Sequence, residues 1–153
     1  MIEVEIEDPA WTSALPETEA VATRAAEAAL TAASQAGDVT VLLADDATVA
    51  DLNERFRGKS GPTNVLSFPA AETARAHLGD IALAFGVCEG EARAQGKPLA
   101  HHLTHLVAHG VLHLVGYDHI TDTEAETMEA LERQLLSGLG VPDPYDGDAT
   151  HAR

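Results

Sequence analysis

The chain has 153 residues, of which 45% are apolar, and it carries a formal net charge of −16. This length suits one globular domain that buries a core without disulfides, and Cys88, the single cysteine, favours a reducing compartment, so we expect a cytoplasmic protein. The strong acidity argues against broad attraction to nucleic acid or anionic membranes, because polyanion binding depends on Lys and Arg. No apolar run approaches the roughly 18 residues that span a bilayer. We therefore expect neither DNA nor a membrane as a partner.

The first half of the chain predicts two strands, each followed by a helix. Apolar residues alternate with acidic ones over 2–6, which is typical of a strand with one buried face. An alanine-rich segment from Pro16 to about Ser34 has the apolar positions of a helix, and the apolar run over 38–44 predicts a buried strand. A short helix then begins near Asp46.

The second half predicts two further strands and three helices. Residues 57–63 are rich in turn-forming residues and predict a loop. The elements expected after it are an edge strand over 64–68 that ends at Pro69, a strand over 78–85, helices over 87–95 and 99–115, and a last helix that opens at the capping box of Thr121 and Glu124. Residues from about 140 to 153 are expected to form a loosely ordered, acidic tail.

Together these elements predict an α+β fold. About four strands are expected, with helices grouped before and after them, and the histidine-bearing helix over 99–115 packs at the centre. The sequence shows no internal repeat and no linker, so residues 1–153 are expected to form a single domain.

Six of the eight histidines lie between positions 101 and 119, and residues 109–119 read His-Gly-Val-Leu-His-Leu-Val-Gly-Tyr-Asp-His. A helix places His109 and His113 on one face, with Cβ atoms roughly 5–6 Å apart. Gly116 lets the chain turn back and bring His119 to the same point. Three neutral imidazoles favour zinc, one Zn²⁺ per chain, and leave a coordination position open for water.

The polar residues around this motif leave alternatives open. His101 and His102 fit satisfied structural histidines at a helix start. His105 lies one turn before the motif. It could contact a ligand residue without binding the metal itself, it could face a substrate, or it could only pack. Asp118 could orient a ligand histidine or hold the turn. Asp80 could hydrogen-bond a ligand imidazole or cap a strand end or turn.

Gly110 argues against a peptidase of the His-Glu-x-x-His type. In that motif a glutamate follows the first histidine and serves as the general base, and here the position is glycine. Water bound to the metal could still attack a phosphodiester if a cation assists the reaction.

A small basic cluster supplies such cations. Arg55, Arg57 and Lys59 flank the loop over 57–63 and could be a solvated helix end, since cations favour a helix C-terminus. Beside a zinc site, however, arginine offers paired donors that match phosphate. Ser60, Thr63 and Asn64 add hydroxyl and amide groups that could contact an RNA backbone.

Four segments carry a resemblance to a known family. They are Phe56-Arg57-Gly58-Lys59, then Pro62-Thr63-Asn64-Val65-Leu66-Ser67-Phe68-Pro69, then Leu78-Gly79-Asp80-Ile81, and residues 109–119. Between about Val39 and Tyr145 the sequence resembles the YbeY family of bacterial endoribonucleases, also called rRNA maturation factors.

The resemblance implies a zinc-dependent, single-strand-specific endoribonuclease that acts in maturation of the 3′ end of the small-subunit (16S) ribosomal RNA and in ribosome quality control. It implies His109, His113 and His119 as the zinc ligands and Arg57 as the residue that holds or polarises the scissile phosphate. It also implies a mixed sheet of about four strands surrounded by helices. In so acidic a chain, we expect the small ribosomal subunit or its associated proteins to help bring the single-stranded rRNA to the site.

Two other functions compete with this interpretation. One is a ribosome assembly factor with a structural zinc and little nuclease activity, in which His105 closes the coordination sphere. The other, disfavoured by Gly110, is a metallohydrolase of peptides.

Overall fold

The structure, a computed structural model, describes residues 1–71, 76–118 and 121–145. In chain order its elements are β1 Ile2–Ile6, α1 Ala10–Ala14, α2 Thr18–Ala32, β2 Asp38–Ala44, α3 Asp46–Arg57, β3 Val65–Pro69, β4 His77–Ala84, α4 Phe85–Ala94, α5 Leu99–Leu114 and α6 Asp122–Gly138. Within these residues, no helix has both the length and the apolar character that crossing a membrane requires.

The four strands form one mixed sheet in the order β1-β2-β4-β3. The pairs β1–β2 and β2–β4 are parallel, and β3 runs antiparallel to β4 at the edge of the sheet. The predicted single α+β domain with a mixed, four-stranded sheet is therefore confirmed.

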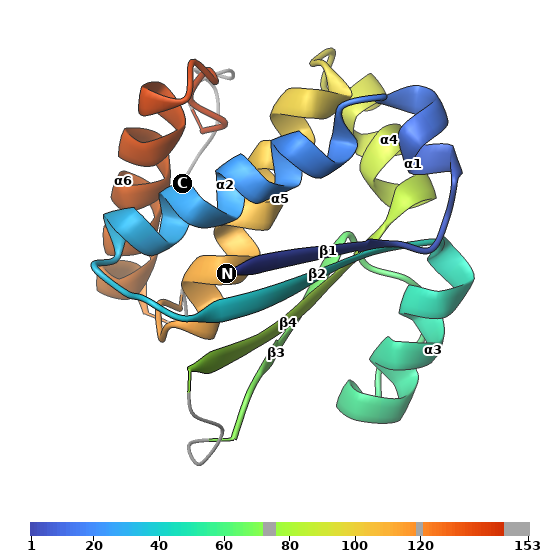
Figure 1. The fold of residues 1–153 in the computed structure, drawn as a ribbon, viewed down its shortest axis with the longest axis horizontal. Coiled ribbons are helices and arrows are strands. Elements are labelled where there is room, and N and C mark those ends of the chain that lie inside the picture. The colour runs from blue at the N-terminus through green and yellow to red at the C-terminus, as the bar shows by residue number, and fades with distance from the viewer. Residues whose placement is uncertain (72–75, 119–120, 146–153) are drawn as a thin grey trace.

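The sheet buries its two faces unequally. Strand alternation sends Ile81 and Leu83 of β4 to a face that packs with α2 and α5, and Ala82 to the opposite face, where Val49 of α3 packs. Figure 1 shows α2 and α5 on one side of the strands and α3 on the other. Helix α5 buries most of its length against the sheet and α2, so the central position predicted for the histidine-bearing helix is also confirmed.

Gly110 lets α5 approach the sheet closely. A Cβ atom at this position would lie 3.2 Å from methyl carbons of Ile81 and Val65 and 3.3 Å from the hydroxyl of Ser67. That hydroxyl donates a hydrogen bond to the carbonyl oxygen of Gly110 over 3.0 Å. The edge strand β3 is thereby fixed beside the histidine-bearing face of α5.

Two segments add detail to the sequence prediction. Helix α1 is not predicted, because five residues are too few to show a helical period; it buries Trp11, whose Nε1 donates to the carbonyl oxygen of Ala44 over 3.0 Å. In the expected tail, residues 141–145 form neither helix nor strand, and Asp143 pairs with Arg133 of α6 over 3.0 Å. The rest of that tail, 146–153, lies outside the described residues.

Gly79 offers a test of how tightly β3, β4 and α5 are packed. A Cβ atom there would lie 2.4 Å from the carbonyl oxygen of Phe68 and 2.8 Å from a methyl carbon of Leu114, at a φ of +148°. We expect Gly79→Ala to lower the free energy of unfolding by about 1–3 kcal/mol in urea denaturation. Gly90→Ala in α4 is the control: its Cβ would meet nothing within 4 Å, and it should raise that free energy by about 0.5–1 kcal/mol. Similar effects from the two substitutions would contradict the packing argument.

Candidate metal centre

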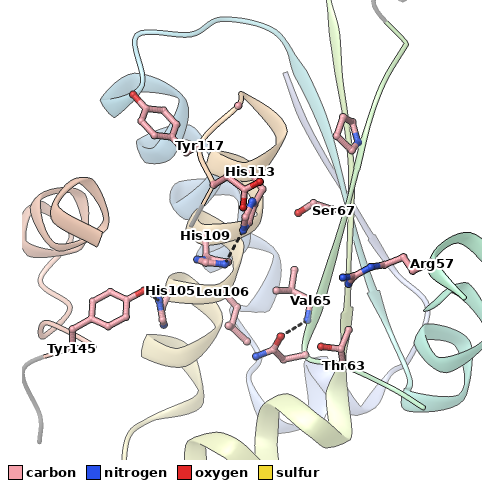
Figure 2. A pocket seen from close by; sticks show the side chains of 14 residues that line it. Arg57, Thr63, Val65, Ser67, His105, Leu106, His109, His113, Tyr117 and Tyr145 are labelled. Carbon is pink, nitrogen blue, oxygen red and sulfur yellow. Dashed lines mark hydrogen bonds between the residues drawn. The ribbon is translucent and has the colours of Figure 1, made fainter. Parts of the chain in front are cut away.

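A cavity of about 770 Å³ lies beside the histidine-bearing face of α5. Histidines 105, 109 and 113 line it from α5, Val65 and Ser67 line it from β3, and Arg57 reaches it from the end of α3. Figure 2 shows His109 and His113 on the α5 side and the guanidinium of Arg57 on the side of β3. The helical period brings His109 and His113 to one wall, the shared helix face predicted for them.

His109 and His113 of the motif meet through their ring nitrogens. Nε2 of His109 and Nε2 of His113 lie 3.1 Å apart. Two nitrogens bound to one tetrahedral zinc at 2.0–2.1 Å would lie about 3.3 Å apart. The pair therefore fits a shared zinc ion on the cavity side, and the donor set of neutral imidazoles suits that metal.

The orientation of His109 depends on Glu132 of α6, a carboxylate with no exposed surface. Nδ1 of His109 donates to Oε2 of Glu132 over 2.7 Å, and Nε2 of His105 donates to Oε1 over 3.0 Å. Because the proton of His109 is used at Nδ1, the lone pair of this ring lies on Nε2 and faces His113. A carboxylate behind a ligand imidazole is a common way to fix its tautomer and ring orientation.

Burial acts on both acidic groups of this network. Burial by itself raises the pKa of Glu132, but hydrogen bonds from His105, His109 and Tyr145, and the charge of His109 when its ring is protonated, outweigh it and lower the pKa to about 2. Burial raises the pKa of the Tyr145 hydroxyl, and the charge of Glu132 raises it further. Glu132 is therefore an acceptor at any working pH, and Tyr145 remains protonated and donates to it.

A second arrangement of metal ligands is geometrically available. His105, His109 and Glu132 offer ligand atoms within 4.8 Å of one another, so this group could hold an ion. Glu132, however, is fully buried and does not line the cavity, and its contact with His109 has the length of a hydrogen bond. The cavity side of His109 is the better position for an ion that must also meet a substrate.

The third predicted ligand, His119, lies outside the described residues. Before it, Gly116 follows α5 with a φ of +105°, and Asp118 lines the cavity. Asp118 thus lies within the motif and at the cavity, which is compatible with either role considered for it.

Arg57 is the last residue of α3. Gly58 ends that helix with a φ of +67°, a conformation that favours glycine, and Asn53 holds the following loop through a 2.9 Å hydrogen bond to the carbonyl oxygen of Gly61. The local sequence thus places a guanidinium at the cavity, opposite the histidines.

The other predicted polar contacts divide into two groups. Thr63 and Asn64 line the cavity, and Asn64 is held by a 3.1 Å hydrogen bond to Glu91. Arg55, Lys59 and Ser60 are exposed and do not line it. Arg55 pairs with Asp51 over 3.3 Å instead. The basic cluster therefore contributes one cation, Arg57, to the cavity.

Asp80 does not hydrogen-bond a ligand imidazole. Strand alternation places it with Ala82 on the face of β4 that α3 covers, away from α5. Its Oδ1 contacts Nε2 of His77 over 3.2 Å, and the side chain is 53% exposed. The alternation of side chains along β4 therefore contradicts the interpretation of Asp80 as a support for the metal site. His105 shares the Glu132 carboxylate with His109, which is compatible with a supporting role for it.

Sequence reasoning missed Glu132 and Tyr145. A signal for Glu132 was present: it lies on the apolar stripe of the last helix, four residues after Met128 and three before Leu135, where a carboxylate needs a buried partner. Tyr145 had no comparable signal, since it lies beyond the last helix in a proline-containing segment.

Glu132→Gln tests the orienting role of this carboxylate. The amide offers one acceptor oxygen in place of two, so His105 and His109 can no longer both donate to it. We expect zinc affinity, measured by competition with a chromophoric chelator, to fall about 10- to 100-fold. Glu126→Gln, an equal charge change at an exposed position of the same helix, should leave the affinity unchanged. Equal affinities of the two variants would contradict the orienting role.

Comparisons with known proteins identify the family to which the chain belongs. The family model described as Endoribonuclease YbeY matches residues 4–140. A protein from Paramagnetospirillum magneticum named endoribonuclease YbeY is 52% identical over 155 residues and the match covers 94% of each chain. One of the same name from Maricaulis maris is 50% identical over 153 residues, covering 96% of this chain and 92% of the relative.

The fold has a solved counterpart as well. The solution structure of TM1509 from Thermotoga maritima matches over 100% of both chains, with a TM-score of 0.58 and 25% identity. The resemblance seen in the sequence motifs is therefore confirmed across nearly the whole chain. By profile, identity and coverage, this protein belongs to the endoribonuclease YbeY family.

Proposed function

We propose that this protein is a zinc-dependent endoribonuclease that cleaves single-stranded RNA, with His109, His113 and His119 as the metal ligands. The observation that carries the proposal is the pair of Nε2 atoms 3.1 Å apart on a cavity wall, with Arg57 lining the same cavity. The name of the family and of its relatives supports the RNA phosphodiester as the substrate bond.

The chemistry of the site follows from its donors. When bound, zinc would lower the pKa of a water ligand or polarise a phosphoryl oxygen. Arg57 supplies paired N–H donors and a fixed positive charge, which suit the nonbridging oxygens of a phosphate and the charge that develops on them. Thr63 and Asn64 lie on the same wall and help to place the RNA backbone. Glu132 holds His109 in the tautomer that this chemistry needs.

The shape of the cavity favours a single strand. The cavity lies between a helix and an edge strand, where the unstacked bases of a single strand can reach its walls, whereas a duplex keeps its bases paired and stacked. With a net charge of −16, most of the surface repels RNA. We therefore propose that the substrate is rRNA near the 3′ end of 16S rRNA, delivered in the cytoplasm by the small ribosomal subunit or its proteins during maturation and quality control.

The peptidase alternative receives no support from the geometry. A Cβ atom at position 110 would already lie 3.2–3.3 Å from Ile81, Val65 and Ser67, so a glutamate there would have to displace these neighbours, and the glycine present offers no general base. An assembly factor with a structural zinc remains the competing function, and the variants below distinguish it from a nuclease.

Arg57→Ala should keep the metal and lose cleavage. Removing the guanidinium removes charge stabilisation at the phosphate, so we expect the rate of cleavage of a single-stranded RNA to fall about 100- to 1,000-fold at unchanged zinc content. Arg55→Ala is a matched control on the same helix, because Arg55 is exposed and already paired with Asp51; it should change the rate less than about threefold. Normal ribosome profiles in cells carrying Arg57→Ala would favour the structural-zinc alternative.

His113→Ala should lose metal and cleavage together. This substitution removes one of the two facing Nε2 atoms but leaves His105, His109 and Glu132 in place. Zinc content by atomic absorption and RNA cleavage should therefore fall in parallel. Retention of stoichiometric zinc would instead place the ion between His105, His109 and Glu132, and full cleavage by metal-free wild type would refute the metal-dependent mechanism.

A further inference from the structure

A second cavity, of about 650 Å³, adjoins the first along α5. The two cavities share four lining residues, Asn64, His105, Leu106 and Tyr145. We infer that the second cavity binds a nucleotide of the RNA strand next to the scissile phosphate and so acts as a subsite of the proposed nuclease, on whose function this inference rests.

The histidine stripe of α5 connects the two cavities. His101 lines the second, His105 lines both, and His109 lines the first. Positions 101 and 109 are eight residues apart, which corresponds to about 12 Å along a helix. A strand held at His109 therefore reaches the second cavity within a few nucleotides. His101, at the start of the stripe, does not belong to the metal site. In this arrangement it takes part in substrate binding.

The walls of the second cavity are fixed before any ligand binds. Nε2 of the buried His102 hydrogen-bonds Oε1 of Glu91 over 2.9 Å, and the amide of Asn64 donates to the same oxygen over 3.1 Å. On the opposite side, residues 141–145 are held to α6 by the 3.0 Å ion pair of Asp143 with Arg133. Prearranged walls reduce the entropy that a bound nucleotide would otherwise cost the protein.

One ammonium group lines this cavity beside two carboxylates. Its carboxylates, Glu91 and Asp143, are both engaged by the partners just named. Lys97 also lines the cavity and forms no ion pair with any described residue. Its ammonium and the amide of Gln95 offer donors to a phosphate or a base edge.

The remaining wall residues are apolar or aromatic. They are Leu106, Val141, Pro142, Pro144 and Tyr145. Apolar surface beside a few donors is what recognises an unstacked base of single-stranded RNA. A site for phosphate alone would need the cation but not these surfaces.

Lys97→Ala and Arg93→Ala form a matched pair for the test. Both remove one positive charge from the same region, but Arg93 is exposed, pairs with Glu89 over 3.6 Å and does not line either cavity. The probes are single-stranded oligoribonucleotides with one common cleavage site, shortened one nucleotide at a time from the 5′ end or from the 3′ end, and kcat/KM is measured with the zinc-loaded full chain.

For wild type we expect kcat/KM to fall about three- to tenfold at one particular shortening step, on one side of the cleavage site only. For Lys97→Ala, kcat/KM should already be lowered by the same factor on the longest substrate. The shortening step that affects wild type should then lower it no further. In Gln95→Ala, the fall in kcat/KM at this step should be smaller than in wild type. Lys97→Arg should show the same fall as wild type, and so should Arg93→Ala. Thermal melting of each variant checks that the fold is intact.

The outcomes separate the subsite from the function on which it rests. An equal loss for Lys97→Ala on every substrate length, or the same loss for Arg93→Ala, would show a general charge effect and overturn the subsite. No loss for Lys97→Ala would overturn it as well. If zinc-loaded wild type cleaved none of the strands, the proposed nuclease function would fail and the subsite with it.

Discussion

The site depends on the buried carboxylate of Glu132. An ionised group without solvent is costly by several kcal/mol unless donors replace its water. Here His105, His109 and Tyr145 all donate to it. These donors come from α5 and from the segment after α6, so one buried charge joins the last helix, the chain beyond it and the histidine-bearing face. The hydrogen bonds that stabilise the buried carboxylate also orient the His109 ring, which faces His113.

The second constraint is the distance between α5 and the edge strand β3. Gly110 removes the side chain that would hold the helix away, and its carbonyl oxygen accepts from Ser67. The antiparallel edge strand can then form the wall opposite the histidines, and α3, on the other face, ends where Arg57 reaches the same cavity. The cavity is thus a product of close packing on one side of the sheet and a helix end on the other.

Electrostatics then decides where an anionic strand can bind on an acidic protein. Exposed charges farther away than the Debye length, about 8 Å at physiological salt, are largely screened. The cations within the cavities, Arg57 in the first and Lys97 in the second, therefore matter more than the net charge of −16. Because the cavities attract an anionic strand while the surrounding surface repels it, this charge distribution favours an RNA that a larger assembly holds at the cavities.

The sequence by itself determined the elements that local patterns specify: the strands, the longer helices, the capping box at Thr121 and the pairing of His109 with His113 on one helical face. These features depend on residues within about one helical turn or one strand period of each other, so the sequence alone predicts them. Only the tertiary structure decided that Asp80 lies on the far face of the sheet, that Arg55 and Lys59 stay outside the cavity, and that Glu132 and Tyr145 stand behind the metal site. Those contacts join residues far apart in the chain, and which side chains meet is set by the packing of α5 against β3 and α6, which no local pattern records.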